Sequence, residues 1–237
     1  MIYFFKIKYI KVNLLKNKSA FTMIELVFVI VVLGIIASLA MGRMDRDLQQ
    51  EASETILSNI RLTQQLALRD NKHSSNSGWQ QAYWQFYLRP CGLDWSYRVS
   101  SNIGLETAGV ASLGKAESAI NPIDGKYLWA TNCTDLNDDE SPSVLLSKKF
   151  GIDTIISTPS CRDGNSESTS IAFDYLGRPH VGSDYDGISD FRKIMLDDCN
   201  ITFTMSTDQN NDDNMDSFTI TIKKETGHAF IIGQESL

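Results

Sequence analysis

The first group that could do chemistry is a single carboxylate in an otherwise apolar stretch. Residues 21–41 read FTMIELVFVIVVLGIIASLAM, and Glu25 is their only charged residue. As an α-helix this stretch is about 32 Å long, which matches the hydrocarbon thickness of a bilayer. An ionised carboxylate at membrane depth costs about 2.5–3.5 kcal/mol unless a partner neutralises it, so such residues usually have a function. Glu25 is therefore the leading candidate for a functional residue.

The second candidate set consists of four widely spaced cysteines. An even number at such spacing is typical of two disulfide bonds outside the cytoplasm. Three pairings are possible, and we favour the one that joins nearest neighbours in sequence, because it would close the irregular loops between them. A zinc site is the alternative, although the chain contains no Cys-x-x-Cys motif. The favoured bonds are Cys91–Cys133 and Cys161–Cys199, and the histidines available to a zinc ion are His180 and His228.

Acidic loops and histidines complete the set of reactive groups. Residues 135–140 and 208–213 both begin with the Asp-x-Asn-x-Asp pattern of calcium loops, but neither has Gly at the sixth position or Glu at the twelfth. We therefore expect solvated turns and no cofactor, with calcium as the alternative. The three histidines have no suggestive spacing, and no nucleophile, zinc-protease or phosphate-loop motif occurs. The sequence thus predicts a protein that is not an enzyme.

A basic leader and a long helix are the elements that position Glu25. Residues 1–20 carry five lysines and no acid, so the positive-inside rule places them in the cytoplasm and the rest of the chain outside. After the predicted transmembrane stretch 21–42, the helical pattern continues over 43–70, where apolar side chains recur every three or four residues. This stripe is suited to packing on a globular domain, and it consists of Leu48, Ala52, Ile56, Ile60, Thr63 and Ala67.

Residues 71–237 have the pattern of a β-rich head. Alternating apolar residues predict an α+β fold, in which the long helix packs on an antiparallel sheet. Trp84, Phe86 and Leu88 share one face of the first strand, which indicates a core position, with a ligand or glycan surface as the alternative. Residues 100–141 have a weak pattern and are predicted to form a long loop exposed to partners. Strands are predicted within 79–88, 93–99, 127–130, 144–146, 152–157, 200–205, 218–223 and 229–232, and a strand with a tight turn within 170–179.

The charge balance separates candidate partners. The whole chain has a formal net charge of −7, and without the leader 17 basic residues remain against 29 acidic ones, which gives −12. An acidic head repels phosphate backbones, so nucleic acid is a poor candidate for its main partner. The roughly 165 residues beyond Asp70 suffice for a single globular core.

The N-terminal pattern resembles the class III signal of type IV prepilins and type II secretion pseudopilins. That signal is a basic leader, a small residue, and Phe-Thr-x-x-Glu-Leu opening an apolar helix, here Phe21–Leu26. The resemblance implies that a prepilin peptidase cuts between Ala20 and Phe21 and methylates the new Phe21 amine. It also implies that Glu25 pairs with the N-terminal amine of a neighbouring subunit, which offsets the cost of burying both charges. The family usually has Gly where this chain has Ala20.

A second resemblance concerns the end of the head. Residues 173–178 (Phe-Asp-x-x-Gly-Arg) and 227–231 (Gly-x-x-x-Ile) are similar to segments of GspH/FimT-type minor pseudopilins. The two resemblances imply a minor subunit that crosses the inner membrane once and carries its head in the periplasm. Such a subunit assembles with other pilins or pseudopilins into a pilus or pseudopilus. The resemblance does not distinguish type II secretion, type IV pilus and competence machinery.

Three alternatives stay open at this point. A DNA-uptake pilin would gather basic residues on one face, for which Arg162, Arg178, Arg192 and Lys193 are candidates. A signal-anchored periplasmic enzyme would need a concave cluster of acids or histidines in the head. An ordinary secretory signal peptide is the third, because Ser38–Ala40 has the small-x-small pattern of a signal peptidase site.

Overall fold

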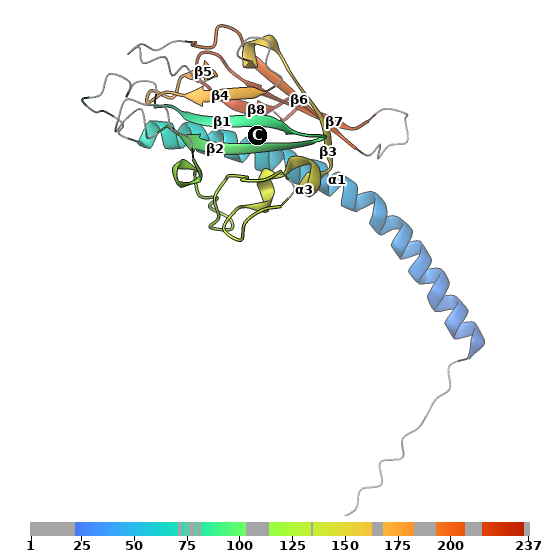
Figure 1. Cartoon of the computed structure of the whole chain (residues 1–237). Helices are drawn as coiled ribbons and strands as arrows, with labels where there is room; N and C mark the ends of the chain where they lie inside the picture. The colour runs from blue at the N-terminus through green and yellow to red at the C-terminus, as the bar shows by residue number, and fades with distance from the viewer. Residues whose placement is uncertain are drawn as a thin grey trace, which may run out of the picture. The chain divides into compact units, whose positions relative to one another are not determined.

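The computed structural model describes residues 22–70, 73, 75, 79, 82–102, 114–133, 135–162, 168–182, 193–206 and 215–234, and for 38–47 the backbone alone. In this part of the chain one long helix, α1 (Met23–Arg69), precedes a head of eight strands (Figure 1). The chain divides after Met41 into two compact units, and the strands belong to the second. The predicted α+β class, a helix followed by an antiparallel β head, is confirmed.

The strands and short helical elements have the following bounds. The strands are β1 (Trp84–Cys91), β2 (Asp94–Ser101), β3 (Ile152–Ser157), β4 (Thr169–Phe173), β5 (Pro179–Val181), β6 (Cys199–Met205), β7 (Ser217–Ile222) and β8 (Ala229–Ile231). The helical elements are η2 (Lys115–Glu117), η3 (Pro142–Val144), α3 (Leu146–Phe150) and η4 (Pro159–Cys161).

The amphipathic second half of α1 supplies one wall of the core. Its buried side chains recur at spacings of three and four, as the sequence predicts for a helix with one apolar face. The apolar ones among them join the inward side chains of both sheets in one hydrophobic cluster, and Figure 1 shows this part of α1 beside β1 and β2. The side chains that are at most 3% exposed are Ala52, Ile56, Ile60, Thr63 and Ala67.

The first sheet is antiparallel and has the order β2-β1-β4-β5. β1 and β2 form a hairpin whose last pair is Cys91 and Asp94, and Gly92 takes up the positive φ of 72° that the tight turn requires. Pro90 is tolerated inside β1 because β4 pairs with β1 only up to Leu88, so its missing N–H breaks no bond to β4. Phe86 and Leu88 are fully buried, which agrees with the predicted core face.

The second sheet has the order β3-β6-β7-β8 and is also antiparallel. β6 alternates buried and half-buried residues along its whole length, as expected for a strand with one face on the core. Its inward residues Ile201 and Phe203 pair with Ile220 and Phe218 of β7. The rings of Phe203 and Phe218 stack at 4.9 Å, which fixes the register of the hairpin.

Three of the four outer sheet edges are capped by other described segments. The edge strand β8 is capped by α1, because Arg61 donates from Nε and Nη2 to the Ala229 carbonyl at 3.1 and 2.9 Å. The Gln234 N–H donates to the next outward carbonyl, that of Ile231, at 3.1 Å. The edge of β2 bridges to Ser118 and Leu145, and the edge of β5 bridges to Ile194.

Two predicted strands are wrong. Residues 127–130 form only isolated bridges at Tyr127. In 144–146, Val144 ends η3, Leu146 begins α3, and Leu145 between them forms only an isolated bridge with Ser96. Pro142 opens η3, where its fixed φ suits a helical turn, and the buried Leu146 and Phe150 follow at helical spacing. The loop predicted to be exposed over 100–141 is also partly buried where it is described, since Leu128 and Glu140 are at most 1% exposed.

Candidate functional site

The first turn of α1 fixes Glu25 at the N-terminus of the helix. Thr22 Oγ1 accepts a hydrogen bond from the Glu25 N–H at 3.3 Å. In return Glu25 Oε2 accepts bonds from the Thr22 N–H at 2.8 Å and from the Thr22 hydroxyl at 2.9 Å. This reciprocal arrangement is a capping box, and it holds the exposed carboxylate beside the positive end of the helix dipole. A cation from another molecule can therefore reach a carboxylate that is already oriented.

Sequence reasoning identified Glu25 but missed the role of Thr22. The Thr-x-x-Glu spacing is the signal that could have found it, because it places the two side chains at the first and fourth positions of a capping box. Ala20 and Phe21, which the resemblance places on either side of the cleavage site, lie outside the described residues.

The first half of α1 exposes a continuous apolar surface. Apart from the half-buried Val32, the large apolar side chains from Met23 to Ile36 are 45–86% exposed, for example Met23 at 86% and Phe28 at 68%. An apolar surface of this extent marks contact with a partner or a membrane.

Among the described residues, no helical stretch combines the length and the apolar character needed to cross a membrane.

The cysteines are joined in the two pairs that the sequence favoured. Their Cα–Cα distances are 5.5 Å for Cys91–Cys133 and 5.0 Å for Cys161–Cys199, within the usual range for disulfides. All four cysteines are therefore used in disulfides, and none is available to the zinc site considered as an alternative.

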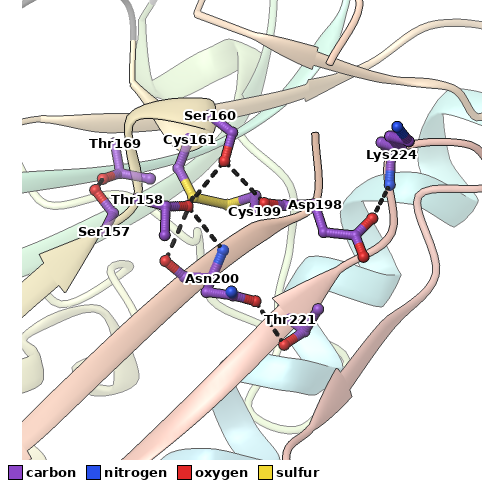
Figure 2. The surroundings of a disulfide bond; sticks show 10 residues. All are labelled: Ser157, Thr158, Ser160, Cys161, Thr169, Asp198, Cys199, Asn200, Thr221 and Lys224. Carbon is purple, nitrogen blue, oxygen red and sulfur yellow. Dashed lines mark hydrogen bonds between the residues drawn. A yellow bond between two sulfur atoms is a disulfide. The ribbon is translucent and has the colours of Figure 1, made fainter. Parts of the chain in front are cut away.

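The buried bond Cys161–Cys199 ties the turn after β3 to the start of β6, as Figure 2 shows. Thr158 Oγ1 accepts the Asn200 N–H at 3.1 Å, and the Ser160 hydroxyl donates to the Asp198 carbonyl at 2.8 Å. The hydrogen bonds thus join the same two segments as the disulfide.

The turn after β4 is built on a buried carboxylate. Asp174 Oδ1 accepts the N–H groups of Leu176 and Arg178, each at 2.9 Å. Its Oδ2 accepts Nε and Nη2 of Arg178 at 2.8 and 2.7 Å and lies 3.2 Å from His180 Nε2. Burial alone would raise the pKa of Asp174, but the hydrogen bonds from His180 and Arg178 outweigh it and hold the pKa below its usual value.

This turn packs closely on α1. A Cβ at Gly177 would lie 2.9 Å from Leu68 Cδ2, and Gln64 Nε2 donates to the Gly177 carbonyl at 2.9 Å. The Phe-Asp-x-x-Gly-Arg segment therefore has a structural role: its carboxylate shapes the turn and its glycine allows the helix to approach.

A groove lies between α1 and the turn at 121–123. Ile123, which is 85% exposed, stands at its edge. The turn is tight, because Asn121 Oδ1 accepts the Ile123 N–H at 3.0 Å and the Asn121 carbonyl accepts the Gly125 N–H at 2.9 Å. The apolar lining is Leu57, Leu62, Pro122 and Ile123, and the polar lining is Glu54, Thr55, Ser58, Asn59, Arg61, Gln65 and Asn121.

A chain of hydrogen bonds connects this turn to α1 through the interior. Asn59 Nδ2 donates to the Tyr97 hydroxyl at 2.8 Å, which lies 3.2 Å from Ser143 Oγ. Ser143 Oγ is 2.9 Å from Ser141 Oγ, which donates to Asp124 Oδ2 at 2.6 Å. Burial raises the pKa of Tyr97 far above its usual value, so the phenol stays neutral. The exposed Ile123 is thus presented by a rigid support.

The other predicted candidates are dispersed. His180 belongs to the Asp174 turn, whereas His228 lies beside Phe230 and His73 beside Trp79. Among the described residues, no group of three or more acids, histidines or cysteines could hold a metal ion. Of the basic residues considered for DNA uptake, Arg178 is engaged by Asp174, and Arg192 lies outside the described ranges, as does the acidic loop 208–213. The predictions concerning enzyme activity and nucleic acid stay predictions.

Comparison with known proteins bears on the N-terminus. Residues 15–41 match the family model of the prokaryotic N-terminal methylation motif, and this range includes Ala20, Phe21 and Glu25. The match confirms the resemblance of the N-terminal pattern to the prepilin signal and supports a type IV pilin-like protein, of the kind that a prepilin peptidase processes. No curated protein and no solved structure matches the chain.

Proposed function

We propose that this chain is a minor pilin or pseudopilin of the GspH/FimT type. It assembles through α1 into the pseudopilus of a type II secretion system or into a type IV pilus. The observation that carries the proposal is the oriented carboxylate of Glu25 within the matched methylation motif. The subgroup is supported by the Asp174 turn, in which Asp174 and Arg178 fix the turn and Gly177 allows it to approach α1.

The mechanism is the pairing of two charges that are unstable alone in an apolar medium. Cleavage before Phe21 creates a new terminal amine, and Glu25 of an adjacent subunit neutralises it inside the core of helices. Removing a carboxylate or an ammonium from water costs several kcal/mol per ion, and a partner of opposite charge offsets this cost. The assembled state is therefore favoured over the isolated subunit. In this proposal the helix anchors the subunit in the inner membrane and the head lies in the periplasm, where its two disulfides are stable.

The groove beside Ile123 is the part of the head best suited to touch a second pilin-like subunit. It combines an aliphatic floor with Glu54 and Arg61, two exposed charges of opposite sign that lie about two turns apart on α1. A partner with an aliphatic side chain flanked by a base and an acid would complement both features. Because the turn is held rigidly, little conformational entropy is lost when a partner docks there.

The test combines a charge-removing variant with cross-linking in cells that contain a prepilin peptidase. A photoreactive amino acid is placed at position 123. The matched control carries it at Leu93, which is 98% exposed at the tip of the β1–β2 hairpin and does not line the groove. We expect adducts with another pilin-like subunit from position 123 and not from position 93. Glu25→Ala should leave the protein in the membrane fraction but reduce these adducts at least about tenfold, since 1.4 kcal/mol already changes an equilibrium tenfold.

Glu51→Ala serves as the control for removing an exposed acid from the same helix. Mass spectrometry of the same samples establishes whether the mature chain begins at Phe21. Normal assembly of Glu25→Ala, or a chain that is never trimmed before Phe21, would contradict the proposed function. A trimmed chain whose assembly depends on Glu25 but which gives no adduct from position 123 would contradict the groove alone.

A further inference from the structure

The loop that resembles the start of a calcium site closes around a lysine. Lys115 lies at the start of η2, and its Nζ is 3.2 Å from Glu140 Oε1 and in direct contact with Asp139 Oδ1. The Glu140 side chain is fully buried, whereas Asp139 is 56% exposed. The hydrogen bond with Asp139 raises the pKa of Lys115 above its usual value, so its ammonium group stays charged.

The lone pairs of Glu140 are already filled by hydrogen-bond donors. Oε1 accepts the Thr131 hydroxyl and Asn137 Nδ2, the latter at 3.0 Å, in addition to Lys115. Oε2 accepts the N–H groups of Thr131 at 3.3 Å and Asn137 at 3.1 Å. A carboxylate offers about four lone-pair sites, so five donors leave no site for a metal ion.

The donor set around Glu140 also does not fit a hard cation. Calcium takes six to eight oxygen ligands, but Asn137 directs its amide nitrogen, and not its oxygen, toward the carboxylate. The loop is closed by backbone bonds as well, since the Tyr127 N–H donates to the Asp139 carbonyl at 2.8 Å and the Ser141 N–H to the Tyr127 carbonyl at 2.9 Å.

We propose that the ammonium group of Lys115 takes the place of a divalent cation in the loop 135–140, so that this loop closes without calcium. The ammonium is a compact charge with three donors, which suits a site where two carboxylates meet. Unlike a bound ion it is covalently attached, so neither dilution nor a chelator removes it. Without it, the buried carboxylate of Glu140 lacks its compensating charge.

The experiment measures thermal unfolding of the full chain in detergent by tryptophan fluorescence. We expect the Tm of the unaltered protein to be the same in millimolar calcium chloride and in EDTA. Lys115→Met should lower the Tm by roughly 5–10 °C, because it leaves a buried charge unpaired. The control Lys149→Met breaks the exposed pair with Glu51 and should lower the Tm by about 2 °C or less.

A second comparison separates loss of charge pairing from loss of packing. The double variant Lys115→Met/Glu140→Gln should recover part of the Tm lost in the single lysine variant, since the buried charge is then also removed. A calcium-dependent rise in the Tm, or terbium luminescence sensitised by the aromatic residues, would overturn the proposal if it persists when Asp208 and Asp212 of the other acidic loop are changed to Asn. Equal Tm values for Lys115→Met and Lys149→Met would overturn it too. If Lys115→Met does not fold, the double variant and the calcium comparison decide.

Discussion

Asp174 illustrates how a buried acid can look like a reactive group in the sequence and serve a turn in the structure. Its donors are the backbone N–H groups of Leu176 and Arg178 and the guanidinium group of Arg178, and His180 lies within the same cluster. These bonds favour the ionised form of Asp174, although the residue is only 1% exposed. Glu140 follows the same logic: burial alone would raise its pKa, but hydrogen bonds from Thr131 and Asn137 lower the pKa to about 2.

Replacing Asp174 should weaken the head and reduce its sensitivity to acid. The pKa of Asp174 is lower in the folded chain than in the unfolded chain, so its contribution is present above the ordinary value of 3.8 and is lost as the pH falls below it. We expect Asp174→Asn to lose about 2–4 kcal/mol of unfolding free energy at pH 7, as removal of a hydrogen-bonded buried charge does. Urea unfolding at pH 7 and pH 3 measures both effects.

Asp153→Asn is the matched control, because Asp153 is exposed and lies on β3. Its unfolding free energy should change by less than about 0.5 kcal/mol. An Asp174→Asn variant that lost as much stability between pH 7 and pH 3 as the unaltered chain would contradict the role given to this carboxylate.

At the scale of elements, α1 acts on the head partly through polar side chains. Gln64 donates to the carbonyls of Gly177 and Thr226, at 2.9 and 2.7 Å, and Arg61 donates to Ala229. These contacts bring the helix close to two turns, and both turns contain a glycine with positive φ, 78° at Gly177 and 66° at Gly227. The packing of the helix on the head therefore depends on the absence of two side chains.

Gly227→Ala should be more harmful than the same change at Gly92. A Cβ at Gly227 would lie 2.7 Å from Gln64 Nε2 and 2.8 Å from Phe173 Cε1, whereas nothing lies within 4 Å of a Cβ at Gly92. Both glycines have positive φ, so both variants lose about 1–2 kcal/mol to backbone strain. The clash should add about 1–3 kcal/mol at Gly227. Chemical denaturation of the two variants measures the difference, and equal losses would contradict the close approach.

The elements that the sequence predicts well are those with long and regular patterns. The helix and the strands β1, β2, β6 and β7 follow from apolar periodicity, because each buries one face on the core. Residues 127–130 and 144–146 were mistaken for strands because a short apolar run does not reveal whether a partner strand lies beside it. The support of the groove could not be predicted either, since Asn59, Tyr97 and Asp124 come together only in the fold. For Glu25, in contrast, the sequence alone is informative, because Glu25 is the only charged residue of the apolar stretch and stands at the Thr-x-x-Glu spacing of a capping box.

For the whole molecule, the two disulfides join segments of similar separation but differ in access. They span 42 residues for Cys91–Cys133 and 38 for Cys161–Cys199, so each should stabilise the head by a similar amount, about 2–4 kcal/mol. Cys161 and Cys199 are fully buried, whereas Cys91 and Cys133 are half-buried. A reductant in solution therefore reaches one bond more readily than the other.

Limited treatment of the folded chain with dithiothreitol should reduce Cys91–Cys133 before Cys161–Cys199. Thiolate attack requires access to a sulfur atom, which the buried bond allows only after local unfolding. Alkylation with iodoacetamide at successive times, followed by peptide mass spectrometry, gives the order. In urea, where the head is unfolded, both bonds should be reduced at similar rates. Simultaneous reduction in the folded chain would contradict the difference in access.

The capped edge of β8 affects how heads can pack side by side without joining their sheets. An open strand edge is a template on which another copy can add its own strand, and this is a common start of domain swapping and fibrous aggregation. In the proposed assembly many heads would stand close together, at a local concentration that a free protein never meets. Because Arg61 occupies the outward carbonyl of Ala229, the helices are free to line up while the neighbouring sheets are kept from merging.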